Sequence, residues 1–180
     1  ISNVLHIKKN KKQFLSIGTG EPRKCIDWLL NNWALSAPTD STLLLYGGEW
    51  RKGISHNILK NIIKKQKIEN EVRIIGRVTE IELARLYASS HVFIFPSMEE
   101  GFGLPPLEAL SNGCNIILPK TPVNIELYGT IAKFYSPGDV EELKNAINDS
   151  LAIDEKENIL FSQQFSLSNF ESELKKVFKV

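Results

Sequence analysis

Short apolar runs alternate with longer amphipathic stretches along this chain, and the two patterns predict different elements. The apolar runs predict strands at residues 14–18, 43–48, 72–76, 92–96, 115–119 and 132–135. Several runs end in Gly or Pro, as strands that lead into tight turns do. Most runs lack polar alternation, so we expect them to be buried on both faces. That pattern favours a parallel sheet covered by helices.

The stretches between these runs carry apolar residues at helical spacing. They predict helices at residues 25–35, 54–67, 79–90, 139–151 and 168–178. Thr79 and Glu82 form a capping-box pattern, and Asp139 and Glu142 stand in the same relation. Strand followed by helix, repeated about six times, predicts an α/β fold. We expect a Rossmann-like, doubly wound parallel sheet of about six strands with flanking helices.

Composition narrows the class of protein. The 180 residues are enough for one well-buried domain, and the net charge of +1 does not indicate a nucleic-acid-binding surface. Cys25 and Cys114 lack metal-ligand spacing and lie in apolar settings, so we expect free buried thiols in a reducing cytoplasm. No run approaches the roughly 18 apolar residues that a membrane-spanning helix needs.

The stretch FPSMEEGFGLPPLEAL, residues 95–110, is the strongest candidate for a binding loop. Pro96 ends a strand, and Pro105 and Pro106 suit a first helical turn, where a missing N–H is tolerated. The amides of residues 101–104 are then free to bind an anion such as a diphosphate at the helix N-terminus. Glu108 is expected in that first turn.

The carboxylates of this stretch need a different partner, because acids repel phosphate. A carboxylate accepts two hydrogen bonds at once, so it can hold a vicinal diol of a ribose or a hexose. Seven residues separate Glu100 from Glu108, so the two can lie at opposite ends of a sugar diphosphate. The alternative is that Glu99, Glu100 and Glu108 only complement the positive end of a helix.

Residues 97–119 resemble the signature of a large family of retaining GT-B glycosyltransferases, the glycosyl transferases group 1. The pattern is Glu-x7-Glu within EGFGLPxLEAxxxG, matched from Glu100 to Gly113, and the resemblance extends over residues 13–151. It implies one half of a GT-B fold, with a nucleotide-sugar-binding domain at residues 13–180. Residues 1–12 would be a linker from a missing N-terminal acceptor domain, and a C-terminal helix at residues 166–179 would pack back toward that domain.

The resemblance also implies roles for single residues. Glu100 would contact the donor sugar near the reacting centre, Lys24 would neutralise the leaving diphosphate, and Glu108 would hold the ribose diol. The remaining donor-binding positions are the first loop, Gly18 and Thr19, the stretch Gly101, Phe102, Gly103 and Leu104, and Gly76 and Arg77 near the nucleobase.

One position departs from the family pattern. Many members carry Arg directly after the first loop glycine, where this chain has Thr19. Arg23, beside Lys24, is the candidate replacement. The alternative is that Arg23 and Lys24 are only exposed charges near a helix start.

The function implied is the donor-binding domain of a retaining glycosyltransferase, which moves a hexose-type sugar from a nucleoside diphosphate to an acceptor hydroxyl. No Asp-x-Asp motif is present, so we expect neither a metal nor another cofactor. The acceptor would be a glycan or a lipid-linked glycan of bacterial surface polysaccharide synthesis, bound through the missing domain. The full-length protein is expected in the cytoplasm, peripheral to the inner face of the cell membrane, and the fragment alone is expected to be inactive.

Two alternatives stay open at this point. The chain could be a non-catalytic module that binds a sugar nucleotide, since the signature fits that role equally. It could also belong to a sugar-nucleotide epimerase with the GT-B fold, although that reaction needs other acid and base residues.

Overall fold

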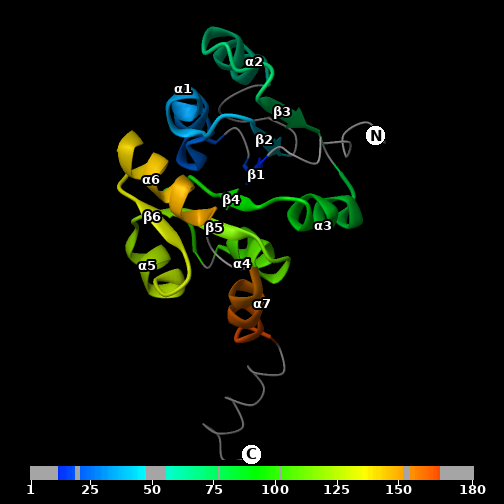
Figure 1. Ribbon diagram of the computed structural model, residues 1–180, viewed down its shortest axis with the longest axis vertical. Coiled ribbons are helices and arrows are strands. Elements are labelled where there is room, and N and C mark those ends of the chain that lie inside the picture. The colour runs from blue at the N-terminus through cyan, green and yellow to red at the C-terminus, as the bar shows by residue number, and fades with distance from the viewer. Residues whose placement is uncertain are drawn as a thin grey trace, which may run out of the picture.

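The structure is a computed structural model that describes residues 12–18, 21–47, 56–76, 78–101, 103–151 and 155–166. Its centre is a six-stranded parallel sheet with the order β3-β2-β1-β4-β5-β6 (Figure 1). The strands are β1 Lys12–Ile17, β2 Ser41–Tyr46, β3 Val72–Ile75, β4 Val92–Ile94, β5 Asn115–Pro119 and β6 Lys133–Tyr135. The predicted Rossmann-like, doubly wound α/β sheet is confirmed.

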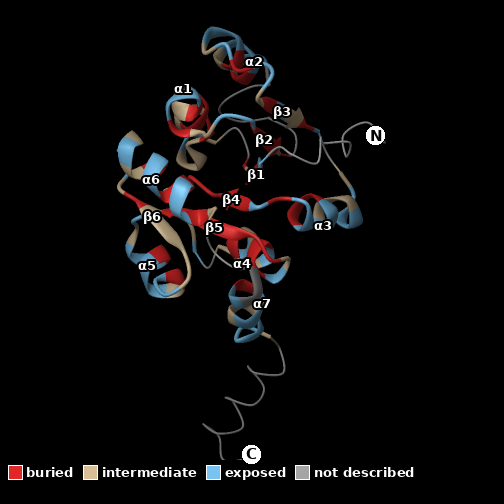
Figure 2. Ribbon diagram, viewed as in Figure 1, coloured by how far each residue is buried: buried red, intermediate tan, exposed pale blue. Residues whose placement is uncertain are grey.

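Helices cover both faces of the sheet, which explains the apolar runs. The helices are α1 Ile26–Ser36, α2 His56–Lys65, α3 Glu80–Ala88, α4 Leu104–Ser111, α5 Pro122–Tyr128, α6 Val140–Ser150 and α7 Glu155–Gln163. In β1, Phe14 packs in a cluster with residues of α1, α2 and α6, whereas Leu15 packs in a second cluster with residues of α3, α4 and α5. Figure 2 shows the central strands β4 and β5 buried and the outer faces of the helices exposed.

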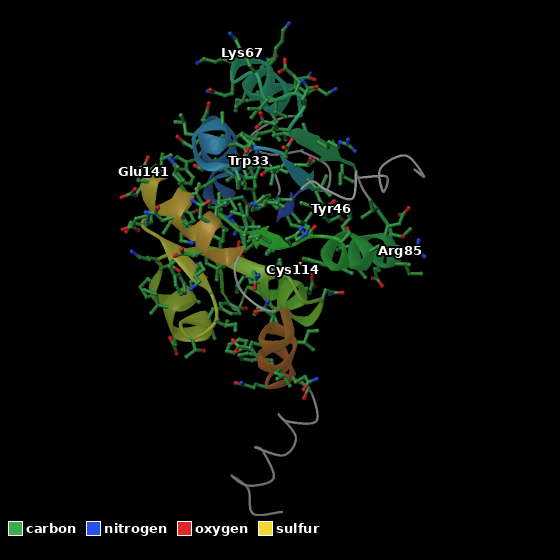
Figure 3. The ribbon with its side chains drawn as sticks, viewed as in Figure 1. Trp33, Tyr46, Lys67, Arg85, Cys114 and Glu141 are labelled. Atoms are coloured by element: carbon green, nitrogen blue, oxygen red, sulfur yellow. The ribbon has the colours of Figure 1, made fainter. Side chains whose placement is uncertain are left out.

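Trp33 is the largest fully buried side chain on the α1 side of the sheet. It is 0% exposed and meets the ring of Phe14 edge to face, with 5.2 Å between ring centroids. Figure 3 shows Trp33 lying between α1 and the sheet, whereas Glu141 lies on the outer side of α6. Helix α1 is therefore anchored firmly, and its N-terminus is held at the carboxyl edge of the sheet.

The helix caps match the sequence at one position and differ at another. At α3, the amide of Glu82 donates to Thr79 Oγ1 and the amide of Thr79 donates to Glu82 Oε2, so the predicted capping box is confirmed. At α6, Asp139 accepts from the amide of Glu142, but the Glu142 carboxylate does not return the bond. The predicted reciprocal capping box at α6 is therefore wrong.

The Glu142 carboxylate contacts neighbours from outside its helix instead. It accepts from Lys120 Nζ at 2.8 Å and from the amide of Ser136 at 2.6 Å. The bond from Lys120, followed by those from Ser136, lowers the pKa of Glu142 to about 2. These contacts fasten the turn between β6 and α6 to the end of β5.

Several elements differ from the sequence prediction. Lys12, expected to end a linker, is the first residue of β1. Helices α5 and α7 were not predicted, although Thr121 caps α5 and Pro122 opens it, a recognisable start signal. The rest of the predicted linker, residues 1–11, and most of the predicted C-terminal helix, residues 167–179, lie outside the described residues.

Candidate functional site

The candidate site lies where the strand order reverses. β1 pairs with both β2 and β4, so the loops that follow β1 and β4 begin side by side at the carboxyl edge of the sheet. Ligands of doubly wound sheets bind in the crevice at such a point. The two loops that follow these strands are joined directly, because the amide of Met98 donates to the carbonyl of Arg23 at 2.8 Å.

Gly18 follows β1 and allows the end of this strand to pack closely against α1. It is buried, and a Cβ atom at this position would lie 2.7 Å from Ile26 Cγ1. Thr19 lies outside the described residues. The chain then forms the short 3-10 helix η1, Pro22–Lys24, and reaches α1 through Cys25, whose φ of 48° is left-handed. This turn presents Arg23 and Lys24 to the loop after β4.

Lys24 and Glu100 form the centre of the site. The ammonium of Lys24 donates to Glu100 Oε1, and Ser97 Oγ donates to the same oxygen at 2.5 Å. Both charged side chains are largely buried, with 13% of Lys24 and 18% of Glu100 exposed. The Lys24 ammonium also lies 5.2 Å from the centroid of the Phe95 ring. The two opposite charges therefore neutralise each other in a partly dehydrated position.

Arg23 braces the loop that carries Glu100. Its Nη1 donates to the backbone carbonyl of Glu99 at 2.8 Å and lies 3.4 Å from Glu100 Oε1, while its Nε donates to Glu21 at 2.8 Å. Arg23 and Lys24 thus do not behave as independent exposed charges, because both contact the same carboxylate. Whether Arg23 replaces the family arginine remains a prediction.

Helix α4 begins beside this pair. Gly103 is its N-cap with a left-handed φ of 70°, and Pro105 follows Leu104 in the first turn. Tyr128 fixes the cap, because its hydroxyl donates to the carbonyl of Gly103 at 2.9 Å. The first N–H groups of a helix have no acceptor within it, so Leu104 can offer its amide to an anion, as can Gly101 in the loop before the cap. Phe102 lies outside the described residues.

Glu108 lies farther along α4 than expected. It is the fifth residue of the helix, so its predicted place in the first turn is wrong; the helix starts at Leu104, and Glu108 falls in the second turn. Its side chain is exposed, and its Oε2 accepts a hydrogen bond of 2.9 Å from the hydroxyl of Tyr87. Glu100 and Glu108 thus flank the N-terminal half of α4.

Gly76 follows the edge strand β3 directly and is exposed at the same carboxyl edge of the sheet. The order β3-β2-β1 separates it from Gly18 by one strand. Arg77 lies outside the described residues. The structure therefore brings Lys24, Arg23 and Glu100 into contact and leaves Gly76 at a distance on the shared edge.

A cavity of about 280 Å³ lies on the α1 side of the sheet, beside the loops that carry Lys24 and Glu100. Trp28 lines it and stacks on Tyr135, with 5.4 Å between ring centroids and parallel planes. The other lining residues are Pro22, Cys25, Asp27, Pro96, Met98, Pro137 and Gly138. This cavity was not predicted from the sequence, because β6 and α1 are distant in the chain and their proximity leaves no local signal.

The cysteines differ from each other. Cys114 is a buried thiol outside any disulfide, as predicted, whereas Cys25 is only partly buried, so that part of the prediction is wrong. Burial, followed by the charge of Asp27, raises the pKa of the Cys25 thiol. Within the described part of the chain, no group of three or more His, Cys, Asp or Glu side chains is arranged to hold a metal ion. No helix there has the length and apolarity to cross a membrane.

Comparisons with known proteins place this geometry in context. The model of the family described as glycosyl transferases group 1 matches residues 1–163. The O-antigen chain mannosyltransferase B of Escherichia coli is 34% identical over 143 residues, which cover 78% of this chain and 37% of that protein. The chain thus spans little more than a third of the length of this relative.

Two solved structures share the fold. The sucrose-phosphate synthase of Thermosynechococcus elongatus aligns with a TM-score of 0.82 at 22% identity, over 98% of this chain and 47% of that chain. Alr3699/HepE of Anabaena, solved in complex with UDP-glucose, aligns with a TM-score of 0.78 at 22% identity, over 94% of this chain and 49% of that chain. The fold therefore corresponds to about half of each of these larger chains.

Proposed function

The chain belongs to the glycosyl transferases group 1 family, and from that premise we propose that it is the donor-binding half of a retaining glycosyltransferase. It binds a nucleoside-diphosphate sugar and positions a hexose for transfer to an acceptor hydroxyl. The observation that carries this proposal is the contact of Lys24 with Glu100. It is made at the carboxyl ends of the adjacent strands β1 and β4, before the N-terminus of α4.

The diphosphate lies between Lys24 and the first turn of α4. The Lys24 ammonium supplies a point charge, and the free amides at Gly101 and Leu104 supply hydrogen bonds along the helix dipole. A cation and preorganised amides stabilise negative charge as the diphosphate leaves, without a metal ion. The hexose then lies at Glu100 and the ribose at Glu108.

Donor binding exchanges partners at the central pair. In the free chain Lys24 and Glu100 neutralise each other. When the donor binds, the ammonium turns to the phosphate oxygens and the carboxylate accepts from sugar hydroxyls. Ser97 keeps the carboxylate in place during this exchange, because its hydroxyl donates to Oε1. The ammonium therefore keeps an anionic partner, and the carboxylate keeps hydrogen-bond donors, before and after binding.

The reaction replaces one bond at the anomeric carbon by another on the same face. The bond from that carbon to the diphosphate oxygen breaks, and a bond to the acceptor oxygen forms. The acceptor proton passes to an oxygen of the leaving diphosphate, whose charge Lys24 stabilises.

The comparisons support the type of donor and product. The relative named O-antigen chain mannosyltransferase B supports mannose as the hexose and a bacterial surface polysaccharide as the product. The complex of Alr3699/HepE with UDP-glucose supports a nucleoside-diphosphate sugar as the donor. The acceptor is a glycan or a lipid-linked glycan, and the full-length enzyme works at the cytoplasmic face of the cell membrane.

Two substitutions test the division of roles. Glu108→Ala should weaken binding of the bare nucleoside diphosphate, because the ribose loses its acceptor, by about tenfold for a lost hydrogen bond to a charged group. Glu100→Ala should leave bare nucleotide binding within about threefold, and it should weaken the sugar nucleotide by about tenfold. Calorimetric titration with UDP, GDP, ADP and their hexose conjugates measures both effects.

Glu141→Ala is the matched control, since this exposed glutamate lies on the outer side of α6 (Figure 3). It should bind every ligand as the unchanged protein does. Unaltered affinity in both Glu100→Ala and Glu108→Ala would show that these acids only complement a helix terminus. Binding without transfer in the full-length protein would favour a non-catalytic binding module.

A further inference from the structure

Tyr87 joins the protein core to the exposed carboxylate of Glu108. The Tyr87 ring is 2% exposed and meets Phe93 with 5.6 Å between ring centroids, inside the cluster under α3 and α4. Its hydroxyl donates to Glu108 Oε2 at 2.9 Å. A side chain locked by packing therefore fixes one oxygen of a carboxylate that otherwise faces solvent.

The hydroxyl has one proton and two acceptors within reach. The carbonyl of Pro105 lies at 3.4 Å, which is long for a bond from a hydroxyl, so Glu108 is the main partner. Burial, followed by the charge of Glu108 and its hydrogen bond, raises the pKa of Tyr87 well above its ordinary value. The phenol stays protonated across the physiological range and remains a donor.

We propose that Tyr87 is a positioning residue, which holds the Glu108 carboxylate in the orientation that grips the ribose diol of the donor. This inference rests on the proposed function. Glu108 Oε2 keeps a lone pair after accepting from Tyr87, and no residue that the structure describes donates to Oε1, so two adjacent hydroxyls can still be bound. Tyr87 thus acts through Glu108 and does not touch the ligand.

The expected gain comes from preorganisation. A glutamate on a helix surface samples several rotamers, and fixing such a side chain at the moment of binding lowers affinity. Tyr87 fixes the Glu108 rotamer before the ligand binds. The packed ring cannot move, so its hydroxyl can donate only to the rotamer of Glu108 that is observed. The benefit corresponds to about three- to tenfold in affinity.

Tyr87→Phe removes only the hydroxyl and keeps the ring in the core. Binding of UDP and GDP should weaken by about three- to tenfold. Binding of their 2′,3′-dideoxy analogues should not change, because these ligands present no diol to Glu108. A purely structural defect would weaken both kinds of ligand equally, so the ratio of the two affinities is the decisive readout, measured by calorimetric titration.

Tyr135→Phe is the matched control, since Tyr135 is 1% exposed and packs on the opposite side of the sheet. It should change neither affinity. The double variant Tyr87→Phe with Glu108→Ala should bind no more weakly than Glu108→Ala alone, because the hydroxyl has nothing left to position. Its measurement also separates positioning from any loss of stability in the single variant.

The outcomes separate this inference from the proposed function. Suppose that the unchanged chain binds UDP or GDP and that Glu108→Ala weakens this binding. The positioning role alone is then overturned if Tyr87→Phe leaves the affinity for UDP and GDP unchanged. It is also overturned if Tyr87→Phe weakens binding of the dideoxy analogues by the same factor. If the unchanged chain binds no nucleoside diphosphate, the proposed function fails and the positioning role fails with it.

Discussion

At the scale of single residues, the site depends on close packing between backbone and side chains as much as on charge. Lys24 lies beside Glu100 because Gly18 lets the end of β1 pack closely against Ile26 of α1, and because Cys25 adopts a left-handed conformation between Lys24 and α1. The signature acids were visible in the sequence, and so was Lys24. The contact between them was not visible, since 76 positions separate the two residues.

Gly18→Ala tests this close approach. The new Cβ would lie 2.7 Å from Ile26 Cγ1, and Ile26 is only 2% exposed, so it has little room to move. We expect the free energy of unfolding to fall by about 1–3 kcal/mol. Gly76→Ala is the control, because no described residue beyond its chain neighbours lies within 4 Å of its added Cβ, and it should change stability by less than about 0.5 kcal/mol. Urea unfolding followed by circular dichroism compares the two, and equal losses would contradict the steric explanation.

At the scale of elements, the six strands were predictable from the sequence, whereas the helix caps were predictable only in part. The capping box at α3 was apparent from the spacing of Thr79 and Glu82 alone. At α6 the same spacing did not give a reciprocal box, because the Glu142 carboxylate accepts from Lys120 and Ser136 instead. The spacing of the two residues thus predicts a capping box, but the neighbouring residues determine whether both of its hydrogen bonds form.

Thr79→Ala tests the cap of α3. The substitution removes an acceptor for the amide of Glu82, and we expect a loss of about 1 kcal/mol in the free energy of unfolding. Thr79→Ser keeps the hydroxyl and should remain within about 0.5 kcal/mol of the unchanged chain. Thermal and urea unfolding measure both variants, and a loss as large for Ser as for Ala would contradict the role of the hydroxyl.

At the scale of the whole molecule, the sheet assembles one edge of a larger site. The loops after β1 and β4 and the start of α4 meet at this edge, together with the end of β3. The chain matches little more than a third of its mannosyltransferase relative and about half of each similar solved chain. Binding of the donor and its transfer are therefore expected to be separable.

The 180-residue chain should bind a nucleoside diphosphate and transfer sugar poorly or not at all. At a ligand concentration a hundredfold above the dissociation constant, binding should raise the midpoint of thermal unfolding by roughly 5–10 °C. A thermal-shift panel of UDP, GDP, ADP and their hexose conjugates identifies the donor. Efficient transfer by this chain alone would contradict the expectation that the acceptor half is required.

The sequence by itself determined the alternation of strands and helices, the parallel sheet and the signature loop. These features depend on local periodicity, on proline and glycine and on short spacings, which are properties of neighbouring residues. Tertiary structure alone decided that Lys24 meets Glu100, that Tyr87 holds Glu108 and that Trp28 lines a cavity with Tyr135. Each of these contacts joins side chains that are distant in the chain, and it exists only because packing on the two faces of the sheet brings their elements together.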